Sequence, residues 1–77
     1  MEISLLQLQT GKKATIKRLE GGLGFQKKLA LLNLRVGKTI KKITAQPFRG
    51  PIVIEIDNTE VSLGAGMAMK IFVGPEE

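Results

Sequence analysis

The stretch PFRGPIVIEI, residues 47–56, joins a tight corner to a regular strand. Its two prolines and its glycine favour a turn, because proline fixes φ and glycine tolerates unusual backbone angles. Isoleucine then recurs at every second position over residues 52–56, which predicts a strand with one buried face. The following pair Asp57-Asn58 is typical of a tight hairpin turn, and Val61 and Leu63 then predict the returning strand.

Two further strands are expected earlier in the chain. Residues Lys13–Leu19 and Thr39–Ala45 alternate apolar and polar side chains, and each stretch contains one slip in the alternation. In the second stretch the slip falls at Lys41-Lys42, between Ile40 and Ile43. A slip of one residue indicates a β-bulge, which bends the strand. Bent strands in a small domain favour a closed or half-closed barrel over a flat sheet.

A short helix is predicted within residues 21–36, between these two strands. Phe25, Leu29 and Leu32 are spaced as i, i+4 and i+7, so they share one helix face. Asn33 is expected to end the helix, because asparagine tolerates the left-handed region better than most residues. The inserted helix should therefore pack one apolar face against the barrel.

Several shorter features complete the expected fold. They are a helical turn capped by Ser4, a return of Leu34 and Val36 beneath the barrel, a 3₁₀ turn over residues 64–68, a last strand through Met69, Ile71 and Val73, and a frayed tail over residues 74–77. Five short strands, one inserted helix and a 3₁₀ turn before the last strand predict an all-β, SH3-like barrel. We expect one domain spanning residues 1–77.

The composition argues against catalysis. The chain has no histidine, cysteine, tryptophan or tyrosine, so it lacks thiolate metal ligands and any side chain that ordinarily titrates near pH 7. We expect a protein that is not an enzyme and has neither a cofactor nor a metal site. The acids Glu55, Asp57 and Glu60 gather near one hairpin, where charged side chains usually form a solvated edge. The first residues resemble neither a signal peptide nor a membrane span, so a cytosolic location is expected.

The net charge of +5 is distributed unevenly along the chain. Residues 12–42 hold ten basic residues and one acid, which gives +9, whereas residues 43–77 hold two basic residues and five acids, which gives −3. Glu2 contributes the remaining −1. Such asymmetry orients a molecule in an electric field, and it suits nucleic acid, an anionic membrane surface or an acidic protein face as a partner.

Several short motifs follow one another in a characteristic order between Leu5 and Val73. They are Leu5 and Leu8 before Gly11, Ile16 and Leu19 before Gly21-Gly22, Lys28-Leu29 and Leu32-Asn33-Leu34 before Gly37, then Pro47 to Ile52, Leu63-Gly64 and Met67 to Ile71. In this order and spacing the chain resembles the FeoA family, ferrous iron transport protein A. Asn33 and Arg49 stand where that family usually or often has glycine. Asn33 retains the left-handed geometry, whereas Arg49 adds a charge to the loop.

The resemblance implies an SH3-like, cytoplasmic accessory protein of ferrous iron uptake. Its implied partner is FeoB, a membrane transporter with a cytosolic G-protein domain, through which the protein would be peripheral to the inner membrane. From the residues themselves, the candidate contacts are Lys27 and Leu31 on the helix and Phe48 and Arg49 in the loop. Aromatic and arginine side chains are common interface anchors, and Leu31 is left over when the helix face that packs on the core is assigned.

Other interpretations of these residues remain open. Leu31 could be a harmless exposed leucine, and Phe48 could fold back onto the barrel. The alternative function is a small basic SH3-like module that binds nucleic acid, but three phenylalanines are a poor supply of stacking surfaces, so no nucleic acid is expected. Val53 and Phe72 are expected outside the barrel interior, where they could join two copies in a homo-oligomer.

Overall fold

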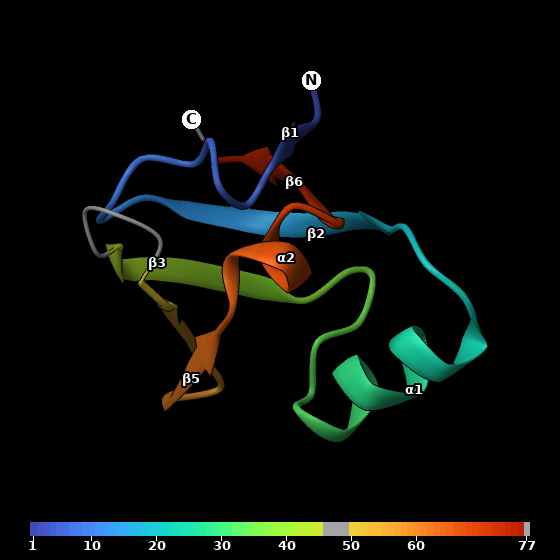
Figure 1. Cartoon of the computed structure of the whole chain (residues 1–77). Helices are drawn as coiled ribbons and strands as arrows, with labels where there is room; N and C mark the ends of the chain where they lie inside the picture. The colour runs from blue at the N-terminus through green and yellow to red at the C-terminus, as the bar shows by residue number, and fades with distance from the viewer. Residues whose placement is uncertain (46–49, 77) are drawn as a thin grey trace.

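Six strands form one antiparallel sheet that curls around a single apolar core (Figure 1). The computed structural model describes residues 1–45 and 50–76. The strands are β1 (Ile3–Ser4), β2 (Lys13–Leu19), β3 (Thr39–Ala45), β4 (Ile52–Ile56), β5 (Thr59–Leu63) and β6 (Ile71–Pro75), and the helices are α1 (Leu23–Leu31) and α2 (Ala65–Ala68). The order β1-β6-β2-β3-β4-β5 makes β1 and β5 the two edges of the sheet.

The core is built from the side chains that face the inside of the curled sheet. Its buried apolar members are Leu5, Leu8, Ala14, Ile16, Leu29, Leu34, Ile40, Ile52, Ile54, Ile56, Leu63, Ala68, Ile71 and Val73. The alternation predicted for β4 is confirmed, because its three isoleucines are buried and the two residues between them are half-buried. Burying one such aliphatic side chain stabilises the fold by about 2 kcal/mol, so this row is a major part of the core.

Both predicted bulges are present. The pairing of β2 with β6 shifts between Ile16 and Arg18, and the pairing of β3 with β4 shifts between Lys42 and Thr44. A bulge bends its strand and increases the local twist. The bends let a small sheet close around its own core, which confirms the expectation of a half-closed barrel.

One charged side chain of β3 lies on the inner face of the sheet, on the same side as Ile40. Lys42 faces the interior and is only 3% exposed, whereas Ile43 is half-buried. The Lys42 ammonium donates to the carbonyl oxygens of Leu5, Leu6 and Leu8 at 3.2, 3.0 and 2.7 Å. Burial lowers the pKa of Lys42, because the charged form loses its hydration. Lys42 therefore organises the loop between β1 and β2.

The amino- and carboxyl-terminal ends are more ordered than the sequence predicted. Ile3–Ser4 forms a sixth strand, which was not predicted, and Ile3 pairs with Val73 of β6. Residues 74–75, predicted as part of a frayed tail, continue β6 and pair with β2. The Glu76 N–H then donates to the Lys13 carbonyl at 3.0 Å. The tail prediction was wrong for residues 74–75, because their pairing with Thr15 and Ala14 of β2 holds them in place.

The turn before the last strand is helical, but it is not a 3₁₀ turn. In α2 the N–H groups of Ala68 and Met69 donate to the residues four positions earlier, at 3.0 Å each, which is the α-helical pattern. The i→i−3 bonds of the 3₁₀ type occur only at its two ends, from Met67 and Lys70. Met69, predicted to lie in the last strand, is instead exposed at the end of this turn.

Val36 does not tuck beneath the barrel as predicted. Leu34 is buried, but Val36 is 63% exposed. The Lys38 N–H donates to the Arg35 carbonyl at 3.1 Å, and Gly37 has φ of 97°, so Val36 lies at the corner of a tight turn. A corner residue points its side chain away from the protein.

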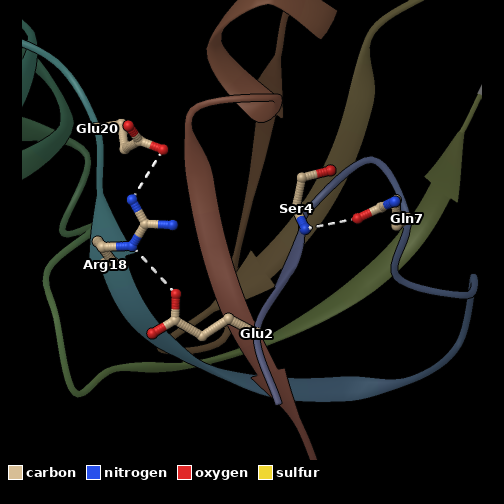
Figure 2. A network of polar contacts seen from close by, with 5 residues as sticks. All are labelled: Glu2, Ser4, Gln7, Arg18 and Glu20. Carbon is tan, nitrogen blue, oxygen red and sulfur yellow. Dashed lines mark hydrogen bonds and ion pairs between the residues drawn. The ribbon is translucent and has the colours of Figure 1, made fainter.

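A small polar network covers the outside of β6 (Figure 2). The Arg18 guanidinium lies between Glu2 and Glu20, with N···O distances of 3.1 and 2.8 Å, and it stacks 4.2 Å from the centre of the Phe72 ring. The hydrogen bond to Glu2, and to a lesser extent the one to Glu20, raises the pKa of Arg18. This contact partly covers Phe72, one of the two residues considered for a dimer.

The turn expected after Ser4 is present, with a different cap. The Ser4 N–H donates to the Gln7 side-chain Oε1 at 3.0 Å (Figure 2), and the Gln7 N–H returns to the Ser4 carbonyl at 2.9 Å. The side chain that closes the turn is therefore Gln7, and Ser4 contributes its backbone.

Candidate partner-binding groove

A groove runs between the end of α1 and the β4–β5 hairpin. It has a volume of about 480 Å³. Its lining residues are Leu31, Leu32 and Asn33 from the helix end and Ile56, Asp57, Thr59, Glu60, Val61 and Ser62 from the hairpin. The groove is thus walled by the carboxyl end of a helix on one side and by an edge strand of the sheet on the other. We call it the α1–β5 groove.

The helix wall of the α1–β5 groove is set by a well-defined helix stop. The Asn33 N–H donates to the Ala30 carbonyl and the Leu34 N–H donates to the Leu29 carbonyl, both at 2.9 Å. This pair of bonds is the Schellman motif, which needs a left-handed residue, and Asn33 has φ of 68°. Leu29 and Leu34 are both buried, so the stop is anchored in the core. Leu31 is consequently turned outward and is 88% exposed.

The hairpin wall is held to the helix end by one carboxylate. Asp57 Oδ2 accepts from Lys38 Nζ at 2.8 Å and also from the Asn33 side-chain amide. Asp57 and Asn58 have φ of 51° and 62°, the values of a type I′ hairpin turn, so the predicted tight turn is confirmed. This carboxylate links the end of α1, the turn that leads into β3 and the hairpin turn, and it therefore helps fix the width of the groove.

The structure places the predicted contact residues in different surroundings. Leu31 lines the α1–β5 groove, whereas Lys27 lies exposed one turn earlier on α1 and outside the lining. Phe48 and Arg49 lie outside the described residues. Leu23, at the other end of α1, is 75% exposed. The prediction that Leu31 is exposed is confirmed, and its role in binding stays a prediction.

The contribution of β5 was not predicted from the sequence. Val61 and Thr59 face the groove because they pair with Ile54 and Ile56 of β4 and share their inner face. Glu60 pairs with Glu55 on the outer face. The alternation of β5 was visible in the sequence, but nothing in it showed that β5 would be an edge strand.

Charge on the outer face changes sign across the sheet. In one row of directly paired residues, Lys13 of β2 lies beside Lys41 of β3, which lies beside Glu55 of β4, which lies beside Glu60 of β5. In this row the basic residues come from β2 and β3 and the acidic residues come from β4 and β5. The groove therefore opens at the acidic end of a basic protein.

Two kinds of feature are absent from the described part of the chain. Within residues 1–45 and 50–76, no three acidic side chains lie where they could jointly hold a metal ion. No helix in that part of the chain is both long and apolar enough to cross a membrane.

The fold and its groove place the chain among small SH3-like barrel domains. The family model described as the FeoA domain matches residues 3–75. The chain therefore belongs to the FeoA domain family, which is associated with ferrous iron transport, and the resemblance inferred from the sequence motifs is confirmed.

Individual relatives agree with this assignment. A protein of Methanocaldococcus jannaschii named Fe(2+) transport protein A is 30% identical over 67 residues, which are 87% of this chain and 79% of that protein. A Porphyromonas gingivalis protein named as a fusion of Fe(2+) transport protein A with the Fe(2+) transporter FeoB is 38% identical over 69 residues, 90% of this chain but 8% of that protein. A crystal structure of an iron uptake regulatory protein, FeoA, matches with a TM-score of 0.89 at 26% identity and covers 99% of both chains.

Proposed function

We propose that this protein is a non-enzymatic accessory protein of ferrous iron uptake that binds a FeoB-type transporter from the cytoplasmic side. The observation that carries the proposal is the Porphyromonas gingivalis relative, whose name joins this kind of domain to FeoB in one chain. Covalent joining holds two parts at a high effective concentration, and it is useful where the parts act together. A separate chain of the same family would then act by binding the transporter reversibly.

The surface that suits such binding is the exposed part of α1 with the groove beside it. Leu31 offers an apolar side chain that is 88% exposed, and Lys27 adds a positive charge one turn away. An apolar centre with a charged rim is the usual composition of a reversible interface. Phe48 and Arg49 remain predicted contacts on the loop before β4. Binding would bias the transporter between conformations only to the extent that the two conformations differ in affinity for the protein.

The test is a binding titration with the purified FeoB-type transporter in detergent micelles, comparing two matched variants. Leu31→Asp removes an apolar contact whose burial contributes about 2 kcal/mol, so affinity should fall at least about tenfold. Met69→Asp changes another exposed apolar side chain, at the end of α2, which lies neither on α1 nor in the groove lining, and it should bind like the wild type. Circular dichroism should show both variants folded. Unchanged binding of Leu31→Asp would refute this surface, and absence of wild-type binding would refute the proposal.

Salt distinguishes this function from nucleic-acid binding. A contact centred on Leu31 should weaken little between low and high salt, whereas binding to several phosphates through lysines should weaken steeply. A single-stranded oligonucleotide is therefore titrated in parallel at two salt concentrations. Tight, salt-sensitive binding of the oligonucleotide together with no binding of the transporter would favour the nucleic-acid module instead.

A further inference from the structure

The edge strand β5 has peptide groups directed away from the sheet. In an antiparallel pair, alternate residues exchange both backbone hydrogen bonds, and a two-residue turn makes Ile56 and Thr59 such a pair. Thr59, Val61 and Leu63 therefore bond to β4, and the N–H and C=O groups of Glu60 and Ser62 point outward. Within residues 1–45 and 50–76, neither of these outward residues makes a backbone hydrogen bond elsewhere. Such an edge can accept another strand.

A groove lies along this open edge. Val61, between the two outward-directed peptides, lines the α1–β5 groove together with Leu31 across it. An extended segment pairing with β5 would direct alternate side chains to the two faces of the sheet. The side chain opposite Val61 would enter the groove, between the sheet edge and the helix end. Proteins can recognise an extended peptide by main-chain hydrogen bonds at a sheet edge, combined with a pocket that takes alternate side chains.

The outer face of the same edge carries an unbalanced charge. Glu60 lies directly opposite Glu55, and like charges in that position destabilise a sheet. Among the described residues, neither glutamate takes part in an ion pair, whereas Asp57 is already bonded to Lys38. A basic side chain on the incoming segment, placed opposite Glu60, would form the favourable cross-strand pair that is missing.

We propose that β5 receives an extended segment in which apolar and basic residues alternate, with the apolar side chain in the α1–β5 groove and the basic side chain beside Glu60. The proposal rests on the proposed function only in taking this segment to belong to the transporter. A second copy of this chain is a poorer occupant, because joining two β5 edges would bring the Glu55 and Glu60 pairs of both copies together. The acidic edge thus selects against self-association and for a basic segment.

The test uses two synthetic heptapeptides as probes, one alternating valine with lysine and the other alternating valine with glutamate. In a titration followed by NMR, the lysine peptide should shift the amides of Glu60 and Ser62 and the methyl groups of Leu31 and Val61. The glutamate peptide should bind at least about tenfold more weakly, because it loses the favourable lysine–Glu60 pair and gains an unfavourable glutamate–Glu60 pair. Equal binding of the two peptides, or shifts confined to the basic face around Lys13, would overturn the proposal.

Two variants separate the contributions of charge and backbone. Glu60→Lys should reverse the preference between the peptides, whereas Glu76→Lys makes the same charge change near β6 and should leave the preference intact. Ser62→Pro removes one outward N–H without removing a bond to β4, and it should lower the affinity for the lysine peptide at least about tenfold. If Ser62→Pro is unfolded, Leu31→Asp serves as the second variant and should also weaken the peptide. Binding unaffected by Glu60→Lys would overturn the proposal.

Transporter binding distinguishes this inference from the proposed function. If wild type binds the transporter and Glu60→Lys binds equally well, the accessory function stands and the β5 site is wrong. If the lysine peptide binds β5 as described and the transporter does not bind, the β5 site stands and the accessory function is wrong. A dimer in sedimentation that Ser62→Pro abolishes would show β5 occupied by a second copy and would overturn the inference.

Discussion

Replacing Lys42 by methionine tests whether a buried ammonium organises the loop after β1. Methionine can occupy the space of the aliphatic stem, but it donates no hydrogen bond. The Leu8 carbonyl oxygen is buried and, within the described residues, accepts only from Lys42. The Leu6 carbonyl oxygen likewise accepts only from Lys42 among the described residues, but it is partly exposed. The Leu5 carbonyl would keep a bond from the Leu8 N–H at 3.3 Å.

The expected loss of stability follows from these three acceptors. Leaving a buried acceptor without a partner costs about 1–3 kcal/mol, and a hydrogen bond to a charged group contributes about 1.5–3 kcal/mol. Methionine also removes the cost of burying the charge, so the losses do not simply add. We expect Lys42→Met to lower the free energy of unfolding by about 3 kcal/mol, which for a domain of this size lowers the Tm by about 15 °C.

Urea denaturation followed by circular dichroism measures this change. The matched control is Lys41→Met, which alters the neighbouring, half-buried lysine on the outer face and should change stability by less than about 0.5 kcal/mol. Faster amide hydrogen exchange over residues 5–8 should accompany Lys42→Met. If the two variants were equally stable, the three carbonyl contacts would not matter to the fold, and the reasoning would be refuted.

Two further predictions concern pH and backbone geometry. Burial lowers the pKa of Lys42 below 10.5, so between the lowered pKa and 10.5 the unfolded chain binds more protons than the folded protein. In that pH window the free energy of unfolding of the wild type should therefore rise with pH relative to that of Lys42→Met. Urea titrations at several pH values measure both variants, and parallel curves would contradict this prediction. Gly21 has φ of 145°, and a Cβ there would lie 2.6 Å from Phe25 Cδ2, so Gly21→Ala should destabilise the protein by about 2 kcal/mol. Gly22→Ala, whose Cβ would meet no atom within 4 Å, is the control and should be close to neutral in the same thermal melts.

Regular local patterns were enough to predict most of the fold. The isoleucine alternation of β4, the Phe25–Leu29–Leu32 face of α1 and the stop at Asn33 each follow from a short stretch of chain. They succeeded because the spacing of apolar residues and the backbone preference of one residue act locally. The slips in alternation also indicated the bulges, and two bulges in a small sheet are a strong sign of a barrel.

The errors arose where distant parts of the chain decide the outcome. In the sequence Lys42 was visible only as part of a slip in the alternation, and only the fold reveals that three carbonyl groups from residues 5–8 surround its ammonium. The strand β1 has two residues, too few for any periodicity, and it exists because β6 offers it a partner. Val36 lies at the corner of a turn that depends on Gly37 and Lys38.

The candidate site was only half predictable for the same reason. Leu31 could be identified because it is left over from the face of α1 that packs on the core. The edge position of β5 could not, because the sequence shows which residues alternate but not which strands are neighbours. Glu60 accordingly looked like one of three acids on a solvated hairpin, and its place opposite Glu55 emerged only from the pairing of β4 with β5.

The pairing of β1 with β6 determines how the domain can be tethered. This pairing brings the two ends of the chain to the same side of the barrel, whereas β5 is the opposite edge in the order of the sheet (Figure 1). A linker attached to either end would therefore leave from the side away from the α1–β5 groove. The domain can be carried on a larger protein through one edge while the other edge stays free to be occupied, so a fused copy and a separate copy could present the same surface.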